Sequence, residues 1–339
     1  MSTTAPGASL RRRAATLAPG LAVAALAAGA SLAATLVLPA VSALLVAIVL
    51  GVLARNLLPL PAALEPGLAV AAKRVLRIGI VLLGLQLVLG DILALGPGMI
   101  AVVVAIVAVG IGATLAAGRW LGVPPAQRLL IACGFSICGA AAVAAVDGVV
   151  ESEEEDVVTA LALVVVFGTL MIPLVPLAAG ALGLAEVDAG LWAGGSIHEV
   201  AQVVAAGSAL GGAALAAAVV VKLARVLMLA PVLAIVSFRR RRELRRTDAS
   251  AARPPIVPLF VVGFIALMLV RSSGLVPVEA VHAAGIVQTV LLAAAMFALG
   301  ANVRISVLRR VGLRPVALGA ISTLVVAGTA LGGVLLAAG

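Results

Sequence analysis

The sequence predicts an all-α, polytopic membrane protein, and three observations support this fold class. The composition is 64% hydrophobic and only 11% charged, with a mean hydropathy of +1.29. A soluble domain of ordinary composition is about half apolar and about a quarter charged. The apolar residues form long segments, and the basic residues gather between alternate segments. We therefore expect a single integral membrane domain over residues 1–339, and no soluble multidomain protein.

About eleven apolar segments, with ten as a lower bound, are long enough to span a bilayer, because a core of about 30 Å needs about 20 helical residues. The segments cover residues 17–38, 41–58, 75–93, 97–118, 127–149, 157–179, 189–209, 212–237, 256–274, 280–301 and 315–338. Three arginines at 11–13 precede the first segment, as in a signal sequence. This segment is long enough to span, so we expect it to remain as a membrane helix.

The basic residues predict the orientation. With the N-terminus in the cytoplasm and strict alternation, 20 of the 23 basic residues fall on the cytoplasmic side. Such an asymmetry fixes the orientation as N-in/C-out under the positive-inside rule. Residues 1–16 are then a cytoplasmic tail, and 239–255 form a basic cytoplasmic loop. The acidic run at 151–156 faces the outside in this arrangement, as a solvated loop.

Eleven segments divide into one extra helix and two five-helix repeats, which would be inverted in the membrane as in many secondary transporters. In this division the segment 127–149 corresponds to the segment 280–301. The first contains Gly134-Phe-Ser-Ile-Cys-Gly139, which is poor helix-forming sequence, and the second ends in Ala298-Leu-Gly-Ala-Asn302. Glycines and small polar residues at matching places in two halves indicate interrupted helices. Helix packing alone is the alternative explanation of these glycines.

The most polar part of the membrane region lies in two consecutive segments, which contain His198, Glu199, Gln202, Lys222 and Arg225. His198 and Lys222 are each about 15 Å from a segment end at 1.5 Å per residue, which places both near the middle of the bilayer. Because Gln202 is four residues from His198 and three from Glu199, we expect these three residues to share one helical face. We expect Lys222 and Arg225, which are three apart, to share another. Charged residues at this depth are costly and usually mark a pathway or a binding site.

A salt bridge between Glu199 and one cation would explain part of this cluster structurally. One carboxylate cannot neutralise both Lys222 and Arg225, however, and a buried unpaired charge is strongly unfavourable. Water or an anion must complete the cluster, helped by Ser136 and by helix ends freed at the glycine-rich interruptions. The sequence therefore favours an anion site with a proton-active His198 beside it.

An intramembrane zinc protease is the rival from another class, because His198-Glu-x-x-Gln202 differs by one residue from the zinc motif H-E-x-x-H. Glutamine is a poor zinc ligand, and the second histidine, His282, lies in a different segment. Three protein ligands cannot be assembled for a catalytic zinc. Cys133 and Cys138 read as small packing residues. We expect no metal, no cofactor and no enzymatic activity.

Three motifs resemble the YeiH-type (UPF0324) family of bacterial inner-membrane proteins, whose members are described as sulfate exporters. The motifs are Ser136–Ala141, Ser196–Gly207 and Val221–Pro231. Shorter similarities occur at 83–86 and 298–300, so the resemblance covers nearly the whole chain after the first segment. It implies an inverted-repeat fold similar to sodium/proton antiporters and bile-acid symporters, and it implies anion export. Ala141 departs from the serine expected in many relatives.

Together these observations predict a secondary transporter of the bacterial inner membrane that exports or exchanges a small anion such as sulfate, coupled to protons. The expected substrate-binding residues are Lys222, Arg225, Ser136, Gly139, Ser196, Gln202 and Asn302, and the expected proton-coupling residues are His198 and Glu199. The partners are the anion, protons and the lipid bilayer, without nucleic acid, and a homodimer is left open. A sodium/proton antiporter with Glu199 as cation ligand is one alternative, and a sensor or structural membrane protein is another.

Overall fold

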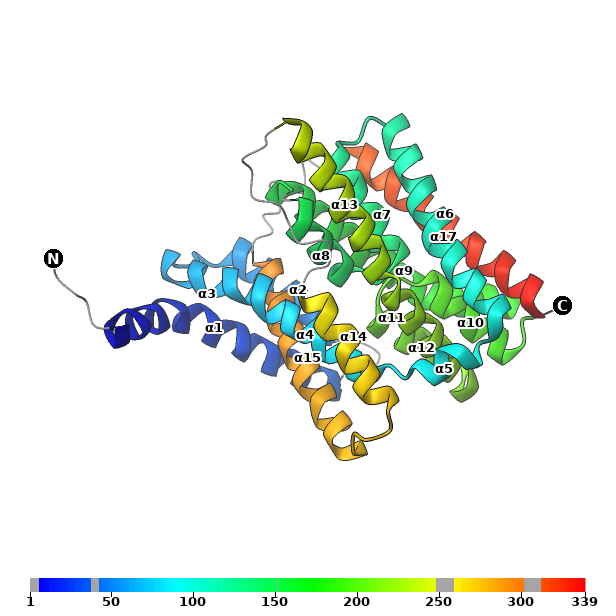
Figure 1. The fold of residues 1–339 in the computed structure, drawn as a ribbon, viewed down its shortest axis with the longest axis horizontal. Helices are drawn as coiled ribbons and strands as arrows, with labels where there is room; N and C mark the ends of the chain where they lie inside the picture. The colour runs from blue at the N-terminus through cyan, green and yellow to red at the C-terminus, as the bar shows by residue number, and fades with distance from the viewer. Residues whose placement is uncertain (1–5, 38–42, 151, 248–258, 302–311, 339) are drawn as a thin grey trace. The chain divides into compact units, whose positions relative to one another are not determined.

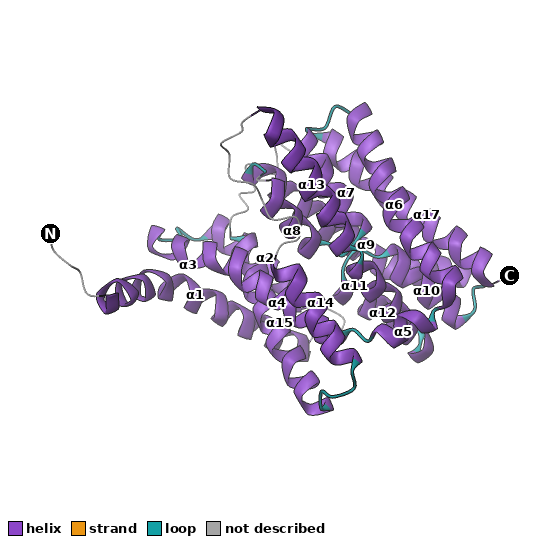
Figure 2. Ribbon diagram, viewed as in Figure 1, coloured by secondary structure: helices purple, strands orange, loops and turns teal. Residues whose placement is uncertain are grey.

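The computed structural model describes residues 6–37, 43–150, 152–247, 259–301 and 312–338, and these residues form helices and short connections without a strand (Figure 2). Within these described ranges, six helices are long and apolar enough to cross a membrane: Ala15–Val37, Gly96–Trp120, Glu155–Ala181, Gly212–Arg242, Val278–Gly300 and Leu313–Ala337. Large apolar side chains such as Leu26 and Leu177 are mostly exposed. A surface of this kind suits lipid rather than water, so the chain is a multi-pass membrane protein.

The chain divides into two compact units, of which the first combines Met1–Leu83 with Val278–Arg309. Its helices are α1 (Pro6–Val37), α2 (Ala43–Leu57), η1 (Ala62–Leu64), α3 (Glu65–Val70), η2 (Ala71–Val75), α4 (Leu76–Leu83) and α15 (Val278–Gly300). Glycines bring pairs of backbones together here. A Cβ on Gly51 would strike the Phe297 carbonyl, and one on Gly300 would strike the Ile48 carbonyl. This close contact of α2 with α15 is the small-residue packing usual in membranes.

The second unit combines Gly84–Pro277 with Arg310–Gly339. Its helices are η3 (Gly84–Gln86), α5 (Leu89–Ala94), α6 (Gly96–Trp120), α7 (Pro125–Ser136), α8 (Ala140–Val150), α9 (Glu154–Ala181), α10 (Glu186–Ser196), α11 (Val200–Leu210), α12 (Gly212–Leu227), α13 (Leu229–Thr247), α14 (Leu259–Ser272) and α17 (Leu313–Ala338). The α-helices among them are labelled in Figure 1. Helices α6 and α17 are antiparallel, because Gly118 faces Leu318 while Gly110 faces Val326. Helix α13 follows α12 after a single residue, Met228. Pro231 comes three residues later, and its ring removes a helical hydrogen bond at this junction.

Helices α7 and α8 fold back on each other as a hairpin, called hairpin A. They are joined by residues 137–139, and Gly139 has a φ of +74°, which favours glycine. A Cβ on Gly134 would touch Val143, nine residues further along the chain. Nine residues of continuous helix would separate these positions by about 13 Å, so the contact requires the chain to reverse direction.

Helices α10 and α11 form a second hairpin, hairpin B, joined by residues 197–199. The Ala213 N–H at the start of α12 donates to Glu186 Oε1 at the start of α10, at 2.9 Å. A Cβ on Gly194 would strike the Ala218 carbonyl further along both helices. The two contacts together show that α10 and α12 start at the same end of the unit and run parallel. Because α11 lies between them in sequence, it must return to the end from which α10 starts.

The two hairpins approach each other from opposite ends of the α12–α13 rod. Hairpin B packs on α12, the first half of the rod, and α8 of hairpin A packs on α13, the second half. Two predicted spans, 127–149 and 189–209, are therefore hairpins and not crossings. Each arm has 11 or 12 residues, a length of about 16 to 18 Å, which is half of a bilayer core. A hairpin and a crossing have the same apolar length in sequence, so length alone did not distinguish them.

Other boundaries also differ from the expectation. The segment 75–93 is divided among α4, η3 and α5, and part of the expected loop 239–255 is helical, because α13 continues to Thr247. Helix α15 runs without interruption to Gly300, so the segment 280–301 lacks a break like the one in 127–149, to which we expected it to correspond. Since α8 returns toward the start of α7, residues 152–156 lie at the same end of the second unit as the α6–α7 connection. The sequence predicted this acidic run on the side opposite to the α6–α7 connection, and that expectation is wrong.

Candidate functional site

The tips of the two hairpins meet in the second unit, and we call this place the tip site. It consists of residues 135–140 of hairpin A, residues 194–199 of hairpin B, Gln202, and the Lys222 and Arg225 side chains of α12. Two helix C-termini, those of α7 and α10, and two helix N-termini, those of α8 and α11, converge here. Orphan carbonyls and N–H groups at helix ends need partners, because no water is available in an apolar interior.

Arg225 joins the two helix C-termini with one side chain that is fully buried. On hairpin A, its Nε donates to the Ser136 carbonyl at 3.1 Å and its Nη2 to the Phe135 carbonyl at 2.8 Å. On hairpin B, its Nη1 donates to the Gly195 carbonyl at 2.8 Å, with the Gly194 and Ile197 carbonyls at 3.3 and 3.1 Å. The planar guanidinium suits this task because its donors point in several fixed directions.

Lys222 completes the same arrangement one helical turn earlier on α12. Its Nζ donates to the Ile137 carbonyl at 2.9 Å and to the Ile197 carbonyl at 2.8 Å, so it also bridges the two hairpins. An ammonium has three N–H donors, and the third is not used in these bonds. Lys222 and Arg225 both reach Ile197, which confirms that they share one face of their helix.

Glu199 serves the two helix N-termini. Its Oε1 accepts from the Ala140 N–H of α8 at 3.1 Å. It also caps α11 in a reciprocal box: its side chain accepts from the Gln202 N–H, and the Glu199 N–H donates to Gln202 Oε1 at 3.1 Å. A carboxylate at two helix N-termini is favoured by their partial positive charge. The Glu199 hydrogen bonds thus go to backbone amides, where the sequence suggested a salt bridge to a cation.

Two separate features of the tip site require a glycine at position 139. Its φ of +74° lies in the left-handed region, and a Cβ would collide with the Glu199 side chain. Gly168 on α9 has a similar role, because a Cβ there would collide with the Gln202 side chain. Gly139 therefore shapes the tip site, as the sequence predicted, by leaving room for the carboxylate.

The polar side chains of the tip site differ in whether their hydrogen-bonding groups have partners. Ser196 Oγ donates to the Trp192 carbonyl of its own helix at 2.7 Å. Ser136 Oγ and Gln202 Nε2 are buried and have no hydrogen-bond partner among the described residues. Ser136 Oγ lies against Gly110 of α6. These two unpaired groups are available to a ligand, whereas the Ser196 hydroxyl is already engaged.

His198 lies at the tip of hairpin B and is fully buried. Its Nδ1 is 3.3 Å from the Phe135 carbonyl of hairpin A, and its Nε2 is 3.2 Å from Thr323 Oγ1 on α17. The ring packs against the Phe135 ring at a centroid distance of 4.4 Å. The expectation that His198, Glu199 and Gln202 share a helical face is wrong, because the chain leaves the helix at 197–199 and His198 turns toward α17.

The structure thus brings together every predicted site residue except Asn302, which lies outside the described residues. Sequence reasoning missed Thr323 and the carbonyls of Phe135 and Gly195. Thr323 is one of several hydroxyl residues on an apolar helix, and carbonyls leave no signal in side-chain patterns. The capping pair Glu199-x-x-Gln202 could have indicated a helix start at this position.

The tip site has an excess of positive charge when both bases are protonated. Lys222 and Arg225 contribute two positive charges, and Glu199 contributes one negative charge. Each helix end adds about half a charge, so two N-termini and two C-termini cancel. About one positive charge remains in a region where Lys222 and Arg225 are fully buried. A buried excess charge of this kind is costly without a compensating partner.

Comparisons with known proteins place this geometry in context. The family model described as "Conserved hypothetical protein 698" matches residues 16–319, which include the whole tip site. A UPF0324 membrane protein of Corynebacterium glutamicum is 58% identical over 87% of this chain and 86% of its own length. The UPF0324 membrane protein TauZ of Paracoccus pantotrophus is 40% identical over 81% and 82%, and a UPF0324 membrane protein of Pseudomonas aeruginosa is 40% identical over 83% and 82%. None of the solved structures matches the chain.

Proposed function

This chain belongs to the UPF0324 family of membrane proteins, and we propose that it is a secondary active transporter that moves a small anion, coupled to protons, across the bacterial inner membrane. The observation that carries the proposal is the meeting of two helical hairpins at buried Lys222 and Arg225. Interrupted helices in membrane proteins occur where the backbone lines a binding site, because unpaired backbone groups are otherwise too costly in lipid.

An anion fits the tip site better than a sodium ion. Sodium would be coordinated by carbonyl oxygens at helix C-termini. In this protein those carbonyls already accept hydrogen bonds from Lys222 and Arg225. The excess of about one positive charge also repels a cation and attracts an anion. We assign Lys222 and Arg225 as the anion ligands, with Ser136 and Gln202 as further donors beside Gly139.

The remaining roles follow from the contacts. Glu199 holds the two helix N-termini in register and acts as the gate between the hairpins. His198 is the proton-coupling residue, since it contacts both hairpin A and α17. Sulfate, a sulfonate or a carboxylate has the oxygen acceptors that these donors require. Ser196 supports the end of α10, and Asn302 stays a proposed ligand outside the described residues.

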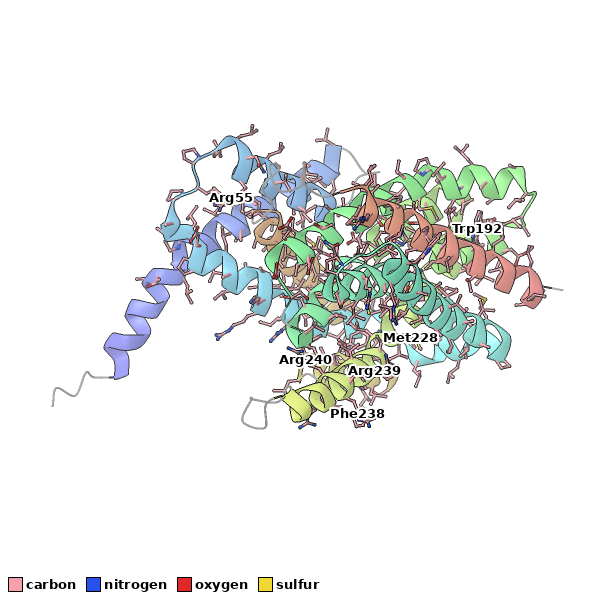
Figure 3. The ribbon with its side chains drawn as sticks, turned by 90° about the horizontal axis from the view of Figure 1, so that it is seen from above. Arg55, Trp192, Met228, Phe238, Arg239 and Arg240 are labelled. Carbon is pink, nitrogen blue, oxygen red and sulfur yellow. The ribbon has the colours of Figure 1, made fainter. Side chains whose placement is uncertain are left out.

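We propose a topology in which nine of the eleven apolar segments cross the membrane and the two hairpins enter from opposite sides. The N-terminus is cytoplasmic and the C-terminus external, as the basic residues predict. The exposed Arg239 in the middle of α13, labelled in Figure 3, is then on the cytoplasmic side. Hairpin A followed by α9, and hairpin B followed by α12 and α13, form the inverted pair in place of two five-helix repeats.

Counterflow of radiolabelled sulfate into proteoliposomes, with an imposed pH gradient, tests the proposal. The wild type should accumulate label in response to the gradient, and Lys222→Ala should not. Lys73→Ala is the matched control, because Lys73 is exposed and lies in the first unit. Equal flux in wild type and Lys222→Ala contradicts the assignment of the anion site. The sodium/proton antiporter would be favoured by a different result: flux that depends on sodium, is lost in Glu199→Gln and is not inhibited by any anion.

A further inference from the structure

The contacts of His198 fix which ring nitrogen carries a proton. The Phe135 carbonyl can only accept a hydrogen bond, so the Nδ1 that lies 3.3 Å from it must be the N–H. In the neutral ring, Nε2 then carries the lone pair and needs a donor. The donor available is the Thr323 hydroxyl at 3.2 Å. The same hydroxyl is 2.9 Å from the Gly319 carbonyl one turn earlier on α17, to which it can donate instead.

We infer that Thr323 is the positioning residue that lets His198 gain and lose a proton inside the bundle, an inference that rests on the proposed proton coupling. With a neutral ring, the Thr323 hydroxyl donates to Nε2. With a protonated ring, Nε2–H donates to Thr323 Oγ1, and the hydroxyl rotates to donate to Gly319 O. Both protonation states are therefore fully hydrogen-bonded without movement of heavy atoms. A hydroxyl can do this because it is donor and acceptor at once.

The surrounding charges link this proton to the anion. The charged groups that act on the ring are Lys222 and Arg225 on α12. Glu199 and Cys138 lie near these two cations, and α17 contributes the Thr323 hydroxyl. A proton on His198 adds positive charge beside two cations, and an anion at those cations offsets it. The proton and the anion therefore bind cooperatively.

The experiment follows His198 directly. The chain has two histidines, and His282 is exposed on α15, so His282→Gln leaves His198 as the sole reporter for nitrogen-15 histidine NMR in nanodiscs. In this background Thr323→Val should lower the proton affinity of His198 about tenfold, because the hydrogen bond lost from the charged ring is stronger than the one lost from the neutral ring. Thr323→Ser should titrate like the parent. The matched control is Thr329→Val, which removes a hydroxyl with the same bond to its own helix, at 2.7 Å to Val325 O.

An unchanged titration in Thr323→Val, or a neutral ring with its proton on Nε2, would overturn the inference whatever the protein transports. In proteoliposomes, Thr323→Val should lose uptake driven by a pH gradient but keep sulfate exchange at equal pH, and Thr323→Ser should keep both. A normal response of Thr323→Val to the gradient also overturns it. Absence of sulfate flux in the wild type would remove the substrate assignment, and the NMR titration would still decide the role of Thr323.

Discussion

Replacing Arg225 by lysine should destabilise the meeting of the two hairpins although the charge is kept. Arg225 donates to carbonyls on both hairpins, at Phe135 and Ser136 on one side and at Gly194, Gly195 and Ile197 on the other. A lysine has one nitrogen with three donors, so it cannot serve all five of these carbonyls. Four of the five depend on Arg225 alone, because Ile197 also accepts from Lys222. If the substituted lysine makes two bonds, as Lys222 does, two of these four carbonyls lose their donor.

The expected size of this effect follows from those carbonyls. A buried acceptor without a partner costs about 1–3 kcal/mol, so two of them cost about 2–6 kcal/mol. This amount is large beside the total stability of a typical domain, about 5–15 kcal/mol. Arg225→Lys should therefore unfold at a clearly lower temperature than the wild type, while it still inserts into the membrane.

The two native thiols provide the assay. Cys133 and Cys138 are both buried in hairpin A, and they are the only cysteines in the sequence. A dye that fluoresces on reaction with a thiol therefore reports when this hairpin opens during heating in detergent. Arg239→Lys is the matched control, because Arg239 is exposed on α13. If Arg225→Lys melts together with this control, the guanidinium bonds do not hold the hairpins as argued.

Two further predictions concern the tip of hairpin A and the topology. Gly139→Ala should abolish transport in a protein that still elutes as a single species. The φ of +74° at this position costs about 1–2 kcal/mol for alanine, and the added Cβ would collide with Glu199. Full sulfate counterflow in this variant would contradict the prediction. A cysteine at the exposed Glu153 should react with an impermeant maleimide from the same side as one at Arg242 and from the opposite side to one at Ala185. Labelling of positions 153 and 242 from opposite sides would restore a crossing at 127–149.

The sequence predicted the composition of the tip site better than its geometry. Depth along the segments correctly placed His198 and Glu199 beside Lys222 and Arg225, because apolar length measures distance from the membrane surface. The glycine-rich interruption after Gly134 is also confirmed, since α7 ends at Ser136 and α8 begins at Ala140. Direction was the missing quantity, because a chain that reverses at mid-depth has the same hydropathy as one that continues.

The partners of the cations were also beyond sequence reasoning. Charged side chains alone, counted from the sequence, provide one carboxylate, Glu199, for the two cations Lys222 and Arg225. Carbonyl groups at helix ends were not part of this count. The structure shows that the carbonyls of Phe135, Ile137 and Gly195 are acceptors for these two residues. Such acceptors are created by the interruption of a helix, so they can be located only after both interruptions are known.

The glycines on α10 have a mechanical consequence for hairpin B. A Cβ on Gly190 or Gly194 would strike the carbonyls of Ala214 or Ala218, so α10 and α12 are in backbone contact and behave as one rigid arm. Helix α11 joins this arm through residues 197–199 and through Gly211, whose φ is +135°. If the hairpin opens, α11 is the part that can swing, and Glu199 at its start swings with it. Lys222 and Arg225 stay behind on the fixed arm, so a single pivoting helix would separate the negative charge of Glu199 from the two positive charges.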